Sequence, residues 1–173
     1  MATEPFLNER SWDKQSSIHL TKLAIPLLKA SLHLKDKKYE EMCLSLLNWA
    51  KKFQKPNGRF VLGENFKYTM LHPNCYAVEG FLFSYAYFKE NWMLDVVKKA
   101  SEWLSGVQNR DGSFLRWYPY TPQNHYYEKF LNLIYKEKAL DVSSQVLRIW
   151  KILGEEKERI EKLENFIKSV MFE

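Results

Sequence analysis

The sequence has only two cysteines, Cys43 and Cys75, in 173 residues. They lie on different predicted helices, and no Cys-x-x-Cys spacing is present. Two cysteines in such positions favour buried free thiols over a disulfide or a metal site. The sequence therefore predicts no metal centre, and we expect no bound cofactor.

Long apolar runs and basic clusters are also missing. No uninterrupted run approaches the roughly 20 apolar residues that a membrane-spanning helix needs. The first residues, Met-Ala-Thr-Glu-Pro, have neither the basic head nor the apolar core of a secretion signal. The net charge of +5 comes from lysines scattered among glutamates, without the basic and aromatic stripe of a nucleic-acid interface. We expect a cytoplasmic protein with no membrane or nucleic-acid partner.

The chain is rich in apolar and aromatic side chains, at 46% and 16% of its residues. A chain of 173 residues with this content is long enough to bury a core as one domain. Residues 1–15 are polar and lack periodicity, so they predict an N-terminal arm. Residues 16–173 predict a helical domain.

Two segments repeat one pattern at a constant offset of 54 residues. Residues 49–60 and 103–114 carry Trp, Gln, Gly and Phe at matching positions, with Asn57 opposite Asp111. Each copy is typical of an amphipathic helix that ends at a glutamine. A tight turn then follows, in which glycine adopts a positive φ, and an aromatic residue returns to the core. We interpret the glutamine and the Asn or Asp of each copy as structural residues.

Helical periodicity divides the chain into paired helices. The six predicted helices cover residues 16–34, 39–53, 73–88, 92–108, 139–153 and 155–171. Pro26 is expected to kink the first helix, whereas Pro73 fits the first turn of the third. Ser16 or Ser17 suits the N-cap of the first helix, and Asn91 suits that of the fourth.

The segments 54–71 and 109–127 are long, aromatic connections between hairpins. Loops of this length in compact domains tend to be functional, and we expect both to contain short extended pieces. The first helix of each hairpin is apolar nearly all round, whereas the second has a charged face. The sequence therefore predicts an all-α fold in which three α-hairpins form an arc, or half, of an α/α toroid.

The glutamine pattern at 54–60 and 108–114 resembles the repeat of terpene-cyclase and prenyltransferase toroids and of six-hairpin carbohydrate enzymes. Together with His-Pro-x-Cys-Tyr-Ala-x-Glu-Gly at 72–80 and Asp-x3-Gln at 141–145, it is similar to the C-terminal half of VpsJ-type polysaccharide-biosynthesis proteins over residues 16–153. Those proteins have six hairpins where this chain has three. The acidic motif of terpene cyclases and the zinc ligands of prenyltransferases are absent from the sequence, so neither activity is implied. The resemblance implies polysaccharide biosynthesis or glycoside-hydrolase-like chemistry.

Polar residues recur at the spacing i, i+4, i+7 on two predicted inner helices, and His19 has nearly the same register on the first. If the inner helices run parallel, their N-termini meet at one mouth beneath the aromatic loops, whose flat rings suit sugars. The predicted catalytic residues are His72, Glu79 and Asp141. The predicted substrate-binding residues are His19, Tyr76, Trp117, Tyr118, Gln145 and Arg148.

Two kinds of chemistry fit such a mouth. Glu79 with Asp141 would be the carboxylate pair of a glycosidase, in which one acid stays protonated. His72 with His19 would be the two bases of a sugar epimerase or isomerase. The structural alternatives are a capping role for His72, an ion pair of Glu79 with Arg148 or another buried cation, and core packing for the aromatic residues.

The first functional hypothesis is a carbohydrate-related toroid domain that binds or processes a saccharide. The alternative is a noncatalytic interaction module. An arc of three hairpins leaves the apolar inner faces of its first and last inner helices uncovered, and such edges drive association. A homodimer of two arcs would close a six-hairpin ring and combine both hypotheses. The sequence names no reaction.

Overall fold

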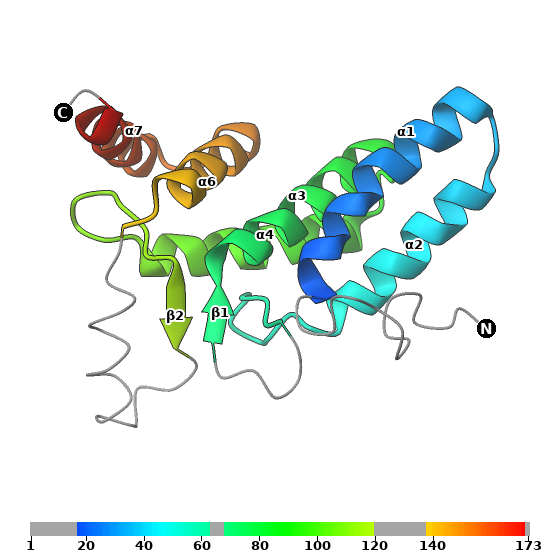
Figure 1. Cartoon of the computed structure of the whole chain (residues 1–173), viewed down its shortest axis with the longest axis horizontal. Coiled ribbons are helices and arrows are strands. Elements are labelled where there is room, and N and C mark those ends of the chain that lie inside the picture. The colour runs from blue at the N-terminus through cyan, green and yellow to red at the C-terminus, as the bar shows by residue number, and fades with distance from the viewer. Residues whose placement is uncertain (1–16, 63–67, 120–137, 172–173) are drawn as a thin grey trace.

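A computed structural model describes residues 17–62, 68–119 and 138–171 (Figure 1). Within these ranges the fold is all-α, as predicted, with one small two-stranded sheet. The elements are the 3-10 helix η1 (Ser17–Leu23), the helices α1 (Ala24–Leu34), α2 (Lys38–Lys51), α3 (Leu71–Phe88), α4 (Asn91–Val107), α6 (Leu140–Leu153) and α7 (Lys157–Met171), and the strands β1 (Tyr68–Met70) and β2 (Trp117–Pro119). The predicted arm 1–15 and the segment 120–127 of the second loop lie outside the described residues.

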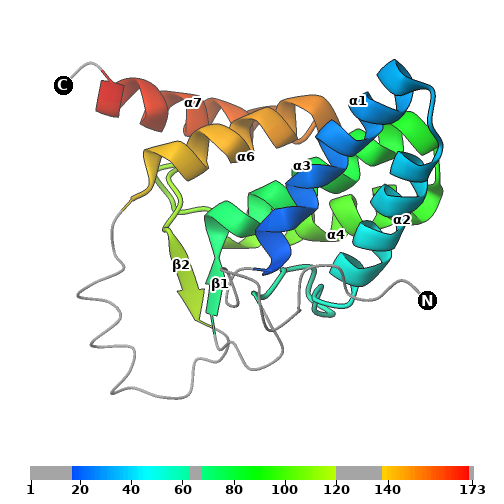
Figure 2. The same ribbon diagram turned by 45° about the vertical axis from the view of Figure 1, so that its right-hand side comes forward.

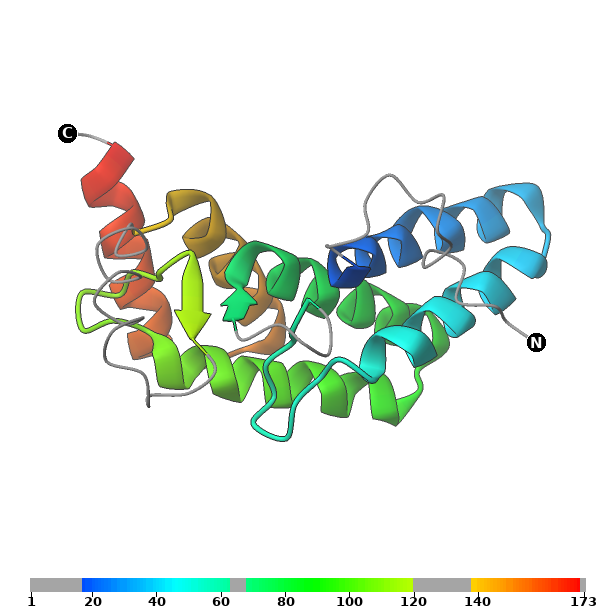
Figure 3. The ribbon, with the colours of Figure 1, turned by 60° about the horizontal axis from the view of Figure 1, so that its bottom comes forward.

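The helices pack as three consecutive hairpins, α1 with α2, α3 with α4, and α6 with α7. The first helices lie beside one another, because α3 contacts both α1 and α6 (Figure 2). Figure 3 shows α2 and α4 along one side of the molecule, with α1 and α3 on the other. The predicted hairpins are therefore confirmed, whereas the toroid arc stays a prediction.

Helix α3 holds the central position because its side chains are apolar or small on nearly every face. Phe81 is fully buried and stacks on Phe60 at a ring distance of 5.8 Å. Gly80 allows α3 to approach η1 closely, since a Cβ there would lie 2.3 Å from the Thr21 carbonyl oxygen. Burial on both flanks explains why α3 is less amphipathic than the outer helices.

Two predicted helix details are wrong. The segment 16–34 is not one helix, because 3-10 geometry changes to α geometry at Ala24. Pro26 therefore lies in the first turn of α1, where its missing N–H removes no helical hydrogen bond and no mid-helix kink is needed. Asn91 is the first residue of α4, and Glu90 takes the N-cap position in an extended conformation without a side-chain capping bond.

The short extended pieces predicted in the two long loops are present. Strand β1 pairs with β2 in antiparallel register, with Thr69 opposite Tyr118. The Leu71 N–H, at the start of α3, donates to the Arg116 carbonyl oxygen at 2.9 Å. The sheet therefore ties the two loops together and brings Arg116 to the N-terminal end of α3.

The two cysteines and the lack of long apolar runs were the scarce features of the sequence. Cys43 and Cys75 are both buried free thiols, as predicted. Burial raises the pKa of Cys43 to about 11, although the hydrogen bond between Cys43 and Ser84 acts to lower it. Burial also raises the pKa of Cys75. Over the described residues, none of the helices combines the length and the apolar character needed to cross a bilayer.

Candidate functional site

Helices α3 and α6 lie side by side and parallel. His72, near the start of α3, has its Nδ1 atom 3.5 Å from the Oδ2 atom of Asp141 at the start of α6. Two turns further along, Glu79 on α3 forms an ion pair with Arg148 on α6. The matching i, i+7 spacing on both helices makes these two contacts successive steps along one interface. The structure therefore brings His72 to Asp141 and Glu79 to Arg148 across α3 and α6.

Arg116 completes the outer end of this interface. Its guanidinium donates two parallel hydrogen bonds to the Asp141 carboxylate, at 3.1 and 3.2 Å. The β1–β2 pairing determines the position of Arg116, because the residue precedes β2 and its carbonyl holds the start of α3. Such a bidentate pair is the strongest form of arginine–carboxylate contact. The predicted site did not include Arg116.

The environment of Asp141 keeps its carboxylate ionised. Partial burial acts to raise the pKa of Asp141. The hydrogen bonds from Arg116 and the Val142 N–H, with the charges of Arg116 and His72, outweigh burial and hold this pKa below its ordinary value. Asp141 is therefore a charged hydrogen-bond acceptor at neutral pH, and not the protonated acid that a glycosidase pair requires.

Glu79 is a buried carboxylate held by cations. The residue is 8% exposed, and Arg148 donates to its Oε1 atom. Lys22 on η1 lies 3.6 Å from its Oε2 atom and 3.8 Å above the ring centre of Tyr76. The ion-pair alternative weighed for Glu79 is therefore present in the structure. Three inner segments, η1, α3 and α6, meet at this one carboxylate.

Two polar atoms along this interface make no hydrogen bond among the described residues. They are the Nδ1 atom of His72 and the Oε1 atom of Gln145, and both are buried. The His72 ring packs edge-on against Tyr76 at 4.3 Å, which fixes the direction of the imidazole. Gln145 lies one turn after Asp141 on the same face of α6. Buried polar atoms without partners are rare and call for a ligand or water.

The remaining predicted residues have different surroundings. His19 is half-buried in η1, and Trp117 is half-buried on β2. Tyr118 packs its ring edge-on against Trp103 at 5.5 Å, and its hydroxyl accepts from the Leu115 N–H at 2.9 Å. Burial raises the pKa of Tyr118 strongly, against that backbone hydrogen bond. These contacts favour the core role for Tyr118 over a sugar-stacking role.

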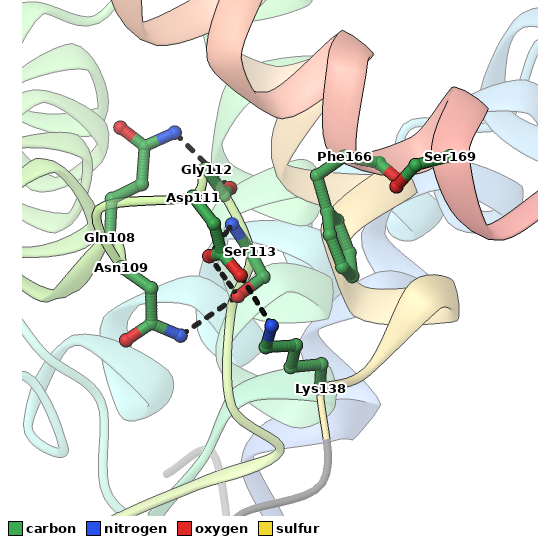
Figure 4. A network of polar contacts seen from close by, with 8 residues as sticks. All are labelled: Gln108, Asn109, Asp111, Gly112, Ser113, Lys138, Phe166 and Ser169. Carbon is green, nitrogen blue, oxygen red and sulfur yellow. Dashed lines mark hydrogen bonds and ion pairs between the residues drawn. The ribbon is translucent and has the colours of Figure 1, made fainter.

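The two predicted turns lie away from these residues and serve structure. In the second turn, Asp111 accepts hydrogen bonds from the Ser113 N–H and hydroxyl and forms an ion pair with Lys138 (Figure 4). The Ala139 N–H donates to the Phe114 carbonyl oxygen at 2.9 Å, directly before α6. The turn therefore sets where α6 begins, and with it the position of Asp141.

A pocket of about 630 Å³ continues from the inner ion pair. Glu79, Arg148 and Lys22 line its end nearest to the site. The rest of its wall is mainly apolar and comes from the C-terminal halves of α3 and α6, part of α4, and Ile25 at the start of α1. The arrangement thus has a polar end at His72 and Asp141 and an apolar end beyond Glu79.

The sequence pattern identified the α3 and α6 residues but missed Arg116 and Lys22. Both are single basic residues among many, without a spacing that relates them to a carboxylate. The only sequence signal is position: Arg116 precedes an aromatic extended segment, and Lys22 follows His19 by three residues on the same helical face.

The comparisons with known proteins give no relative. No protein-family model, curated protein or solved structure matches the chain. Over the described residues, no group of histidine, cysteine and acidic side chains is arranged to hold a metal ion.

Proposed function

We propose that this chain is a saccharide-binding helical domain, with the ligand held at the polar end of α3 and α6. The observation that carries the proposal is the pair of buried atoms that make no hydrogen bond, His72 Nδ1, which lies 3.5 Å from Asp141 Oδ2, and Gln145 Oε1. A hydroxyl group both donates and accepts, so a polyhydroxylated ligand can satisfy an amide oxygen and an imidazole nitrogen together. An apolar ligand would leave both atoms unpaired, at a cost of about 1 to 3 kcal/mol each.

The charges nearby favour an acidic saccharide. Arg116, Arg148 and Lys22 supply three positive charges, and Glu79 and Asp141 supply two negative ones. The difference, three minus two, leaves one positive charge before any protonation of His72. Complementary charge improves selection of a partner more than it improves affinity. We therefore expect uronate-containing saccharides to bind better than neutral ones.

The surroundings of Asp141 and Glu79 favour a domain that binds a saccharide without hydrolysing it. Glycoside hydrolysis needs one protonated and one ionised carboxyl group on either side of the scissile bond. Asp141 has its pKa lowered in the presence of Arg116, and Glu79 pairs with Arg148 and Lys22. Neither carboxyl group has the apolar, cation-free surroundings that keep a catalytic acid protonated.

Calorimetric titration with short neutral glucans and short uronate oligomers tests the proposal. We expect Gln145→Leu to weaken uronate binding about tenfold, because one hydrogen bond from the ligand is lost. In the free protein the same change removes an unpaired buried oxygen, so the unfolding temperature should stay the same or rise. Ser144→Ala, at an exposed position next along α6, is the matched control and should leave binding unchanged.

Two results would contradict the proposal. One is the absence of binding by the unchanged protein to any glucan or uronate at millimolar concentration. The other is equal affinity for Gln145→Leu, Ser144→Ala and the unchanged protein, which would mean that the saccharide binds elsewhere.

The interaction-module alternative has one observation in its favour. Leu32 and Leu34, near the end of α1, and Met42 on α2 are large apolar side chains exposed to solvent at the first hairpin. Exposed apolar groups of this size at the edge of a helical array favour association with another chain. Light scattering over a range of concentrations tests it: we expect a dimer that Leu32→Ser with Met42→Ser dissociates, and a monomer at all concentrations would rule out the homodimer.

A further inference from the structure

We infer that the pocket beyond Glu79 binds a single-chain amphiphile, with its apolar tail among α3, α4 and α6 and an anionic head group at the lysines on its rim. This ligand is separate from the saccharide proposed above, and its site begins where the polar end stops. The inference rests on the shape, the apolar wall and the charge of the pocket. The apolar wall and the charges of Lys89 and Lys98 have no use in saccharide binding.

The wall of the pocket is suited to a hydrocarbon chain. Leu82 and Phe83 come from α3, and Ile149 and Ile152 come from α6. Ile152 is 63% exposed although it lies in this wall, so its side chain is available to a ligand. Apolar surface of this kind is favourable to cover, in proportion to the area removed from water.

All but one of the charged side chains that line the pocket are basic. The basic residues are Lys22, Lys89, Lys98 and Arg148, and the acidic residue is Glu79. Four positive charges minus one negative charge leave an excess of three. Glu79 engages Lys22 and Arg148, whereas Lys89 and Lys98 have no carboxylate partner among the described residues. An anionic head group would complement these two lysines.

The size of the pocket favours a small molecule over a docked helix. Its volume of about 630 Å³ lies within the roughly 300 to 1,000 Å³ of ordinary small-molecule sites. A protein helix is about 10 Å wide with its side chains and needs an open groove several turns long. The wall here comes from one end of the α3–α6 pair, part of α4, and Lys22 and Ile25 at the η1–α1 junction.

Calorimetric titration with octyl compounds, each below its micelle concentration, tests the inference. Octyl phosphate and octanoate carry anionic heads, octyl glucoside a neutral sugar head, and octyltrimethylammonium a cationic head. We expect both anions to bind at least about tenfold more tightly than the ammonium compound, because of the excess positive charge. Lengthening the chain from octyl to nonyl phosphate should strengthen binding about fourfold, as burial of one further methylene predicts.

Two exposed positions allow variants that should fold normally. Lys98→Glu should weaken octyl phosphate binding about tenfold, whereas Lys99→Glu, the neighbouring exposed lysine of α4, should leave it unchanged. Ile152→Ser should weaken binding severalfold, because it removes apolar wall. Leu32→Ser is its matched control, since Leu32 is also 63% exposed and lies outside the pocket.

The amphiphile and saccharide proposals fail independently. Gln145→Leu should leave octyl phosphate binding unchanged, and Lys98→Glu should leave uronate binding unchanged. Equal affinity for the anionic and cationic octyl compounds would overturn the inference, as would equal effects of Lys98→Glu and Lys99→Glu. Sedimentation in which octyl phosphate dissociates a dimer would overturn it too, because a second copy of the chain would then be the occupant.

Discussion

The two glutamine turns, at residues 54–60 and 108–114, have the same backbone design but differ in charge. In each, the glutamine amide donates to the carbonyl oxygen of its own glycine and to a carbonyl oxygen of the next outer helix. These distances are 3.0 and 2.8 Å for Gln54 and 3.3 and 3.1 Å for Gln108. Each turn thus joins one hairpin to the outer helix of the next. The repeat in the sequence encodes this joint.

The difference lies at the residue before the glycine. Asn57 Oδ1 accepts a long 3.5 Å hydrogen bond from the Arg59 N–H. Asp111 accepts at 3.0 Å from the Ser113 N–H and pairs with Lys138. Partial burial acts to raise the pKa of Asp111, but the hydrogen bonds from Lys138 and Ser113 lower it to about 2. The two turns therefore share a backbone conformation, but of the two we expect only the turn with Asp111 to make stability depend on pH.

The largest expected effect comes from replacing either turn glycine with alanine. At Gly58, an added Cβ would lie 1.9 Å from the Lys99 carbonyl oxygen. At Gly112, it would lie 2.3 Å from the Lys162 carbonyl oxygen. Both glycines also have positive φ angles, of 92° and 88°. Because backbone atoms must move, we expect each substitution to lower the free energy of unfolding by about 3 kcal/mol or more, measured by chemical denaturation.

Gly154 separates the effect of the φ angle from that of the close approach. Its φ is 72°, and a Cβ there would have no atom within 4 Å. Gly154→Ala should therefore lower the free energy of unfolding by only about 1 kcal/mol. Equal losses at all three positions would show that contact with the next outer helix does not constrain the turns.

Removal of the glutamine amides should have the next largest effect. We expect Gln54→Ala to lower the free energy of unfolding by about 2 kcal/mol and Gln108→Ala by about 1 kcal/mol, because each loses two hydrogen bonds and those of Gln54 are shorter. Thermal denaturation of both variants measures the difference. Asn165→Ala, which truncates an exposed amide on α7, should change stability by less than about 0.5 kcal/mol. A larger loss of stability for Gln108→Ala than for Gln54→Ala would contradict this prediction.

Acid should affect the second turn and spare the first. The pKa of Asp111 falls from 3.8 in the unfolded chain to about 2 in the folded protein. Its stabilisation is therefore complete above about pH 4 and is lost as the pH falls towards 2. The Asp111 side chain is 44% exposed, so solvent screening reduces the expected contribution to about 1 kcal/mol.

Urea denaturation across this pH range measures the effect. Asp111→Asn should be less stable than the unchanged protein at neutral pH and equally stable near pH 2. Asp95→Asn, at an exposed position on α4, is the control and should follow the unchanged protein at every pH. An identical pH profile for Asp111→Asn and the unchanged protein would rule out this role of Asp111.

The smallest expected effect is that of giving the first turn a charge. Asn57 is exposed, and none of the lysines in the described ranges is hydrogen-bonded to its side chain as Lys138 is to Asp111. We expect Asn57→Asp to change the free energy of unfolding by less than about 0.5 kcal/mol, in either direction, by the same urea titration. A gain as large as the contribution of Asp111 would mean that the turn itself, and not the lysine, stabilises the carboxylate.

Features of the fold that depend on local chemistry could be predicted from the sequence. Apolar spacing gave the helix pairs, and the repeated glutamine and glycine gave the turns, because both signals act within a few residues. Asn91 shows the limit of such signals. An Asn before an apolar run suits either the cap or the first turn, and the chain used Glu90 as the cap.

The candidate site was predictable only where helical spacing repeats. His72, Glu79, Asp141 and Arg148 share one spacing on two parallel helices, so their meeting could be expected. Arg116 could not be found in this way. Its contact with Asp141 depends on the register of β1 against β2, and that register is a long-range property of two loops.

We expect some positions of this chain to change more slowly in evolution than others, and one cause is the close contact between η1 and α3. Even a methyl group at Gly80 would push η1, which contains Thr21, away from α3. Any lineage that retains this close contact must retain glycine there, whereas exposed positions such as Lys29 and Glu102 are free to drift. Distant relatives should therefore be traceable by their glycines after their surface charges have diverged.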